Sequence, residues 1–288
     1  MTTSSARDDE NDGLSLQAAA DLLGVHYMTA YRYVRTGRLP ATQIDGTWRV
    51  QRSSLAELAP PGRPGRAKRG APAKPAGGHG KYEQGLSDQL VQGDEAQAWR
   101  VTQQALSSAY SPEDLYLEVL GPALRRVGDE WAAGRVSVAE EHQASALMQR
   151  LIGRLGPLLT RRGRSRGTVV LGAPENDFHS LPSALVADVL RGRGFSVVDL
   201  GANTPSASFA QAAAAAKRLV GTGMVVSAPL ADPEITAAIA AVKLGSNTPL
   251  LLGGVTIRDE AHALQLGADA FTSSARGAVD WFDAASRR

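Results

Sequence analysis

The fold of this chain is decided by the stretch Ala173-Pro-Glu-Asn-Asp-Phe-His-Ser-Leu181. It follows the apolar run Thr168-Val-Val-Leu171 and precedes the helix-like segment Pro182–Leu190. A strand, a loop and a helix in this order place the loop at the carboxyl edge of a parallel sheet, where ligands usually bind. This loop is therefore the first candidate for a binding site.

Two residues of the loop, Asp177 and His179, have side chains suited to holding a metal. The carboxylate can accept the proton on one imidazole nitrogen and leave the other nitrogen free as a ligand. The alternative is a solvated loop histidine with an acidic neighbour, because Asp-x-His alone is a weak motif. The rest of the chain has to decide between the two.

The segment 164–288 alternates predicted strands and helices. The expected strands are Thr168–Leu171, Ser196–Leu200, Met224–Ala228, Leu250–Leu252 and Ala270–Thr272. The expected helices are Pro182–Arg193, Ser206–Val220, Pro233–Leu244, Ile257–Leu266 and Gly277–Ala285. Such βα units predict an α/β domain with a doubly wound parallel sheet of flavodoxin-like (Rossmann-type) topology. No G-x-G-x-x-G and no Walker lysine follows the first strand, which argues against a dinucleotide or a nucleoside triphosphate.

The beginning of the chain has a different pattern. Residues 1–13 are polar and without apolar periodicity, so we expect disorder. Ser15–Leu23 predicts a helix capped by Ser15, and His26–Thr36 predicts a second helix after a Gly24 turn. Asp45-Gly46, between two β-prone arms, is typical of a hairpin. A short helix at 53–58 completes a module that spans 14–59.

This module resembles the winged helix-turn-helix of MerR-type and excisionase-like DNA-binding proteins. The resemblance implies that the second helix enters the major groove of a duplex DNA operator and that residues near the wing meet phosphate. The implied DNA contacts are Thr29, Tyr31, Arg32, Arg35, Arg38 and Arg49. The alternative is that Tyr27, Tyr31 and Tyr33 only pack a small core.

Two further segments lie between this module and the α/β domain. Segment 60–81 is rich in Pro, Gly and basic residues and predicts a linker that attracts phosphates without reading sequence. Segment 82–163 is helical throughout, with breaks at Gly93-Asp94, Ser111, Gly121-Pro122 and 133–137, and predicts an all-α helical bundle. Ser137-Val-Ala-Glu140 is a capping box that opens its last, long helix.

Composition excludes several classes of protein. No apolar run reaches the roughly 18–20 residues of a membrane span, and the polar, acidic N-terminus is unlike a signal peptide. We therefore expect a cytoplasmic protein without a membrane partner. The chain has no cysteine, which excludes disulfides, thiolate metal sites and a thioether-linked chromophore.

A helical bundle before a flavodoxin-like domain with Asp-x-His resembles the cobalamin-binding module. In that family the histidine is the lower cobalt ligand, and the pattern is D-x-H-x-x-G, then S-x-L, then G-G. Here Asp177, His179 and Gly253-Gly254 match. Leu181-Pro182 stands where the family has the glycine that makes room for the cofactor's nucleotide tail, and Ser227-Ala-Pro-Leu230 is one residue longer than S-x-L. These departures imply an altered tail path or weaker binding.

The helical segment carries a second resemblance. The spacing W-x9-E-H, from Trp131 to Glu141-His142, is similar to the adenosyl-facing cap of the CarH/LitR family of light-responsive, cobalamin-dependent repressors. The alternative is a core tryptophan and a solvated helix face. The family also has a histidine directly after the tryptophan, where this chain has Ala132. Because a methyl group cannot bind cobalt, that route to a second histidine ligand is closed, and His142 is the nearest substitute.

The combined resemblance implies a light-responsive transcriptional regulator, not an enzyme, that binds adenosylcobalamin and assembles as a dimer or tetramer. The implied metal ligand is His179. The implied cofactor-binding residues are Trp131, Val138, Glu141, His142, Glu175, Asp177, Phe178, His179, Ser180, Leu181, Ser227, Leu230, Gly253 and Gly254. Two alternatives stay open: a regulator with another or an additional, non-covalently bound tetrapyrrole (bilin or haem), and a corrinoid carrier protein of a methyltransferase system.

Overall fold

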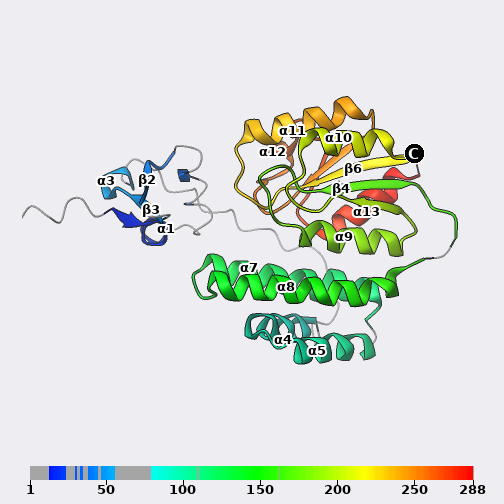
Figure 1. Cartoon of the computed structure of the whole chain (residues 1–288), viewed down its shortest axis with the longest axis horizontal. Helices are drawn as coiled ribbons and strands as arrows, with labels where there is room; N and C mark the ends of the chain where they lie inside the picture. The colour runs from blue at the N-terminus through cyan, green and yellow to red at the C-terminus, as the bar shows by residue number, and fades with distance from the viewer. Residues whose placement is uncertain are drawn as a thin grey trace, which may run out of the picture. The chain divides into compact units, whose positions relative to one another are not determined.

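The computed structural model describes residues 13–23, 30, 33–34, 38–44, 47–55, 79–108, 110–161 and 163–287. The chain folds as two compact units (Figure 1). The first comprises Met1–Lys74 and Glu130–Arg135, and the second comprises Pro75–Asp129 and Val136–Arg288. Within the described ranges, no helix combines the length and the apolar character that crossing a membrane requires.

The first unit is built on a small antiparallel sheet. Its elements are β1 (Leu14–Ser15), α1 (Leu16–Leu23), β2 (Ala41–Ile44), β3 (Thr47–Val50) and α3 (Arg52–Leu55), with strand order β1-β3-β2. Ser15 Oγ accepts the Ala18 N–H at 3.2 Å, which confirms the predicted cap. Ile44 pairs with Thr47, as the predicted hairpin requires, whereas strand β1 was not expected.

The predicted recognition helix lies largely outside the described residues, and with it lie Thr29, Tyr31, Arg32 and Arg35. The same holds for residues 1–12 and for most of the predicted linker. The last residues of the predicted linker are an exception. Helix α4 begins at His79, whereas the sequence predicted that the helical segment begins at Tyr82. The described part of the recognition helix contributes Ala30, Tyr33 and Val34 to the core of the unit. For Tyr33, the core-packing alternative is therefore correct.

The second unit begins with a helical region. Its elements are α4 (His79–Gln92), α5 (Glu95–Ser107), α6 (Pro112–Leu115), the π-helical turn η1 (Tyr116–Leu120), α7 (Gly121–Ala132), α8 (Val138–Leu155) and the 3-10 turn η2 (Gly156–Leu159). Three of the four predicted breaks occur. Asp94 caps α5 by accepting the Gln97 N–H at 2.9 Å, and Ser111 caps α6 at 3.1 Å. The capping box of Ser137 and Glu140 opens α8 as predicted.

The predicted break at Gly121-Pro122 was wrong, because the helix continues from Pro112 to Ala132 through η1. Pro122 has no N–H, so an ordinary α-helical turn would leave a carbonyl without its donor. A wider π-turn shifts the bonding pattern, and the Gly121 N–H donates to the Tyr116 carbonyl instead.

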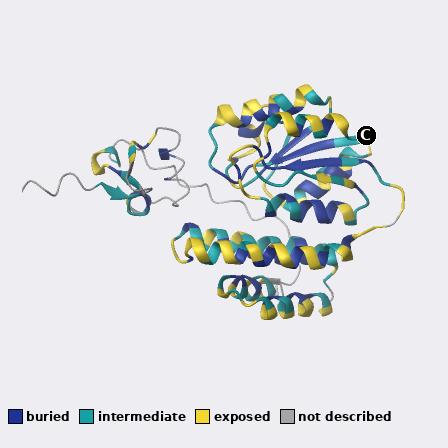
Figure 2. Cartoon of the chain, in the orientation of Figure 1, coloured by how far each residue is buried: buried dark blue, intermediate teal, exposed yellow. Residues whose placement is uncertain are grey.

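The α/β domain follows, with the predicted topology. Its strands are β4 (Thr168–Gly172), β5 (Ser196–Asp199), β6 (Leu219–Val225), β7 (Leu250–Gly253) and β8 (Ala270–Thr272), all parallel in the order β5-β4-β6-β7-β8. Its helices are α9 (Leu181–Gly192), α10 (Ser206–Ala215), α11 (Asp232–Gly245), α12 (Glu260–Gln265) and α13 (Ala275–Ala285). Helices α9 and α13 cover one face and α10, α11 and α12 the other, so the central strands β4, β6 and β7 are mostly buried, whereas the edge strands β5 and β8 are not (Figures 1 and 2).

The third strand was misplaced by the sequence analysis, which expected it at Met224–Ala228 after a helix reaching Val220. The helix ends at Ala215 and the strand begins at Leu219. Gly221 and Gly223 make this stretch look like a loop, yet both lie in a crowded strand. A Cβ on Gly221 would lie 2.9 Å from the Pro249 carbonyl oxygen, and one on Gly223 would lie 2.6 Å from Leu171 Cδ2.

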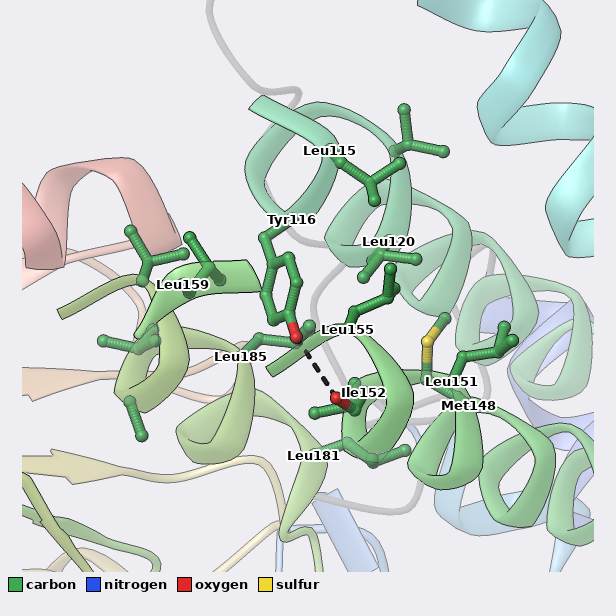
Figure 3. Packing of buried hydrophobic residues seen from close by; sticks show 14 of the residues in the cluster. Leu115, Tyr116, Leu120, Met148, Leu151, Ile152, Leu155, Leu159, Leu181 and Leu185 are labelled. Atoms are coloured by element: carbon green, nitrogen blue, oxygen red, sulfur yellow. Dashed lines mark hydrogen bonds between the residues drawn. The ribbon is translucent and has the colours of Figure 1, made fainter. Parts of the chain in front are cut away.

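Helices α8 and α9 share one core, which joins the helical region to the α/β domain. Figure 3 shows Tyr116 at its centre, with Leu155, Leu159 and Leu185 around it. The Tyr116 hydroxyl donates to Asp188 Oδ2 at 2.9 Å and lies 3.3 Å from the Ile152 carbonyl oxygen. A buried polar link is therefore embedded in the apolar interface between the two parts.

Candidate cobalamin site

The reversal of strand order sets the place of the site. The chain proceeds from β4 to β5 in one direction and from β4 to β6, β7 and β8 in the other. Loops that leave neighbouring strands on either side of such a point separate and form a crevice at the carboxyl edge. The loop of Ala173–Leu181 leaves β4 at this position, as predicted.

Asp177 is completely buried, and its carboxylate connects two loops. Oδ1 accepts from the backbone N–H of His179 at 3.1 Å and lies 2.7 Å from His179 Nδ1. Oδ2 accepts from the backbone N–H groups of Ser227 at 2.6 Å and Ala228 at 3.0 Å. Burial would raise the pKa of Asp177, but these hydrogen bonds hold the pKa below its ordinary value. The side chain is therefore a buried carboxylate that meets only donors.

His179 is oriented by this carboxylate. Because an ionised Asp177 only accepts, His179 Nδ1 carries the shared proton, and Nε2 of the neutral ring holds the free lone pair. The side chain is 53% exposed, so the ring is accessible at the edge. The hydrogen bond to Asp177 raises the pKa of His179, burial opposes this, and the charges of Asp177 and Glu141 add to the rise. The neutral ring, with its proton on Nδ1 and a free lone pair on Nε2, is the form in which an imidazole binds a metal.

Two asparagines that the sequence analysis missed shape the loop. Asn176 and Asn203 both have positive φ, at 67° and 50°. Asn203 Oδ1 accepts the Asn176 N–H at 2.9 Å, and the Asn203 N–H donates to the Asp177 carbonyl at 2.6 Å. The left-handed region favours asparagine among residues with a side chain, so this residue type was the signal. Asparagine has this conformation once after β4, at Asn176, and once after β5, at Asn203.

Gly253 and Gly254 end β7 at the same edge. Gly254 has φ +118°, and a Cβ there would lie 2.0 Å from the Val226 carbonyl oxygen. Only glycine fits, so the edge presents bare backbone beside the loop of Ser227. Ser227 is buried, and Leu230 packs against the core under α11 and α12.

Glu141 and His142 lie in the first turn of α8. Glu141 bonds His142 Nδ1 at 2.6 Å and accepts from Ser145 Oγ at 2.7 Å. Glu141 also acts electrostatically on His179, so the structure brings the start of α8 and the β4 loop together. The His142 side chain is 74% exposed, and Val138 and Phe178 are exposed apolar residues on these two elements.

Other predicted residues are placed differently. Glu175 is exposed and Ser180 half-buried in the loop, whereas Leu181 is buried in the core that α9 shares with α8. Trp131 lies in the last turn of α7, within the segment Glu130–Arg135 that groups with the first unit. A cap made by Trp131 with Glu141 and His142 therefore stays a prediction.

In the first unit, the two described arginines of the predicted DNA surface have partners within the chain. The Arg38 guanidinium lies 4.8 Å from the centre of the Tyr33 ring. Arg49 Nη1 donates to the Gly13 carbonyl at 3.3 Å. Arg38 precedes β2 and Arg49 lies in β3, and their contact with DNA stays a prediction.

Family models match three separate segments of the chain. Residues 14–59 match the family model of a helix-turn-helix domain, and residues 82–155 and 167–280 match two models of a B12 binding domain. These matches to one helix-turn-helix model and two B12 binding models support cobalamin binding.

The relatives match about two thirds of the chain. The chain is 25% identical over 197 residues to trimethylamine corrinoid protein 1 of Methanosarcina acetivorans, covering 67% of this chain and 91% of the relative. It is 24% identical to monomethylamine corrinoid protein 1 of Methanosarcina mazei, covering 67% and 92%. The solved monomethylamine corrinoid protein of Methanosarcina barkeri has the same fold, with a TM-score of 0.58 and 21% identity over 70% of this chain and 97% of that one.

Proposed function

We propose that this chain is a transcriptional regulator that binds cobalamin at the carboxyl edge of its α/β domain and duplex DNA through residues 14–59. The observation that carries the proposal is the Asp177–His179 pair at the strand-order reversal in a chain that also has a helix-turn-helix domain. The corrinoid relatives are matched over nearly their whole length, so the helix-turn-helix domain is what this chain has in addition.

The residues present fit a corrinoid. His179 would hold cobalt through Nε2, and Asp177 would fix the ring and its tautomer from below. Gly254 lets the end of β7 pack directly against the Val226 backbone, where any Cβ would meet the Val226 carbonyl. Leu181-Pro182 is the misfit, because Pro182 falls on the glycine position of the related pattern and the side chain of Leu181 beside it is buried. We therefore expect weaker binding or a displaced nucleotide tail.

Light is the proposed signal. Adenosylcobalamin supplies a cobalt–carbon bond that light can break. Glu141 and His142 lie near the start of α8, and the charge of Glu141 acts on His179. These two residues would contact the adenosyl group and sense its loss. A ligand shifts a conformational equilibrium only through unequal affinity for the two states. We propose that the dark ligand favours a dimer or tetramer that binds DNA and that its loss favours separation.

The test uses the full chain reconstituted with adenosylcobalamin in the dark. We expect a His-ligated absorption spectrum that changes on illumination, together with a change in oligomer size and in affinity for DNA. In His179→Ala the histidine-dependent spectrum should be lost, whereas His142→Ala should keep it and change only the light response. A His179→Ala protein with the parental spectrum would contradict the assignment of the ligand.

The second candidate is a corrinoid carrier of a methyltransferase system, which the names of the relatives favour. A carrier would bind the same corrinoid but would show neither sequence preference for DNA nor loss of DNA affinity in Arg49→Ala. Absence of both effects in the full chain would favour the carrier. Pigment extraction from the purified protein also tests for another or an additional tetrapyrrole, because bilin, haem and corrinoid differ in absorption.

A further inference from the structure

The edge of the sheet opposite His179 carries a cluster of exposed cations. We call this cluster the basic edge and define it by its residues, which are Arg161, Arg164, Lys217, Arg218 and Arg287. They come directly before β4, directly before β6 and directly after α13, so all lie at the amino ends of the strands. From His142 to Pro174 the sequence has six arginines and no acid.

Side-chain contacts bring these segments together. Arg218, at φ +53°, donates to the carbonyl oxygens of Ser165 at 2.9 Å and Arg166 at 3.3 Å. A Cβ on Gly194 would lie 3.5 Å from Arg161 Cδ and 3.6 Å from Arg166 Cδ. Arg166 Nη2 also donates at 2.8 Å to Ser286 Oγ, next to Arg287. The cations therefore form one surface.

The basic edge lacks acidic partners, whereas five of the six other described cations of the α/β domain have them, Arg258 being the exception. The five that pair with carboxylates are Arg166, Arg191, Arg193, Lys243 and Arg276. Within the described part of the second unit, no member of the basic edge makes an ion pair. Of the nearby acids, Asp283 is bound by Arg166 and Arg193, Glu113 is bound by Arg193, and Asp280 acts on Arg193.

We propose that the basic edge binds the phosphate backbone of duplex DNA, so that the α/β domain adds sequence-independent affinity to the helix-turn-helix domain. This inference rests on the proposed function in taking DNA as the partner. Duplex DNA presents a charge every ~1.7 Å, so it can meet several of these cations at once, which a small anion cannot. Cations that lie within about a Debye length of one another, ~10 Å at 0.1 M salt, repel until a polyanion is bound.

The experiment compares the full chain with the variant R161Q/R164Q/K217Q. Arg166 and Arg218 are spared because they hold the backbone at this edge. The matched control R100Q/R125Q/R258Q removes three exposed cations that lie elsewhere on the second unit. Binding of a fluorescent mixed-sequence duplex of about 40 base pairs is measured from about 50 to 300 mM salt, and circular dichroism and melting verify that each variant is folded.

Each lost phosphate contact lowers the slope of log K against log salt by about 0.9. We expect the slope of R161Q/R164Q/K217Q to be up to about 2.7 smaller and its affinity at about 50 mM salt to be at least tenfold weaker, with the control close to the parent. Parental binding by the variant, or an equal loss in the control, would overturn the inference.

The inference and the proposed function can fail separately. If operator preference and an effect of Arg49→Ala are found but the basic-edge variant binds normally, only the basic edge is refuted. If the variant loses affinity while no sequence preference exists, the basic edge stands and the regulatory function fails. Crosslinking the parent to DNA gives an independent readout, since the crosslinked peptides should contain residues 161–166 and 217–218.

Discussion

At the scale of single residues, the site depends on groups that tolerate no isosteric replacement. Asp177 is surrounded by four donors, and Gly254 lies against a carbonyl oxygen. The first position requires a side chain that only accepts, and the second requires no side chain. Both requirements can be tested by small substitutions.

Asp177→Asn should lower cobalamin affinity by ~10–100-fold. The amide –NH2 would face an N–H donor, and it could be satisfied at His179 only by reversing the tautomer, which places the proton on Nε2. Absorption titration measures the affinity, and the ¹⁵N shifts of the imidazole report the tautomer. Asp199→Asn, which only loses a turn contact to the Gly201 N–H, is the control. Unchanged affinity in Asp177→Asn would show that this carboxylate does not orient the ligand.

Gly254→Ala should destabilise the second unit by more than the ~1–3 kcal/mol of an unfavourable φ, because its methyl group would overlap the Val226 carbonyl. Gly201→Ala is the matched control, since Gly201 also has positive φ but no atom within 4 Å of its Cβ position. Denaturant unfolding measures both variants. If Gly254→Ala and Gly201→Ala lowered the free energy of unfolding equally, the overlap with the Val226 carbonyl would add nothing to the cost of positive φ.

At the scale of elements, polar contacts connect the helical region to the α/β domain. Arg193, just after α9, bonds Glu113 of α6 and Asp283 of α13. Arg276 of α13 bonds Glu118. With Tyr116 and Asp188, these contacts hold the helical region to the α/β domain.

Tyr116→Phe should cost ~1.5–3 kcal/mol, because Asp188 would lose a donor in a buried place. Tyr82→Phe is the control, since its hydroxyl bonds Ser108 in an exposed place.

The contribution of Tyr116 should also depend on pH. Burial, and after it the charge of Asp188, raises the pKa of Tyr116 above its ordinary value of 10.0. This stabilisation is complete below pH ~10 and decreases as pH rises further, because only the unfolded chain then loses the proton. Unfolding at about pH 7 and about pH 11 should show the difference between parent and Tyr116→Phe shrinking; a difference that does not depend on pH would argue against it.

At the scale of the whole molecule, binding and stability are linked. Cobalamin at about 100 times its dissociation constant should stabilise the second unit by ~2.7 kcal/mol, which for a domain of this size raises its melting temperature by about 5–10 °C. Calorimetry of the full chain should show this shift in one transition, with the transition of the first unit unmoved. His179→Ala should shift less at the same cobalamin concentration. A cobalamin-independent melting temperature in the parent would contradict binding at this site.

Local pattern was enough to predict much of this protein. The alternation of strand and helix from Thr168 onward, the caps at Ser15, Ser111 and Ser137, and the loop of Asp177 and His179 all follow from short-range chemistry. The caps satisfy backbone donors within three residues, and apolar runs with polar ends indicate strands. No long-range information is needed for either.

Tertiary structure alone decided the remainder. The third strand begins at Leu219 because the segment pairs with β4 from Thr168 onward. Gly221 and Gly223 fit there because Pro249 and Leu171, which are distant in sequence, leave no room for a side chain. The donors that fill Asp177 Oδ2 come from Ser227 and Ala228, fifty residues away. The basic edge exists because three separate segments meet at one end of the sheet. Each depends on which strands are neighbours, and that order results from packing the whole sheet between its helices.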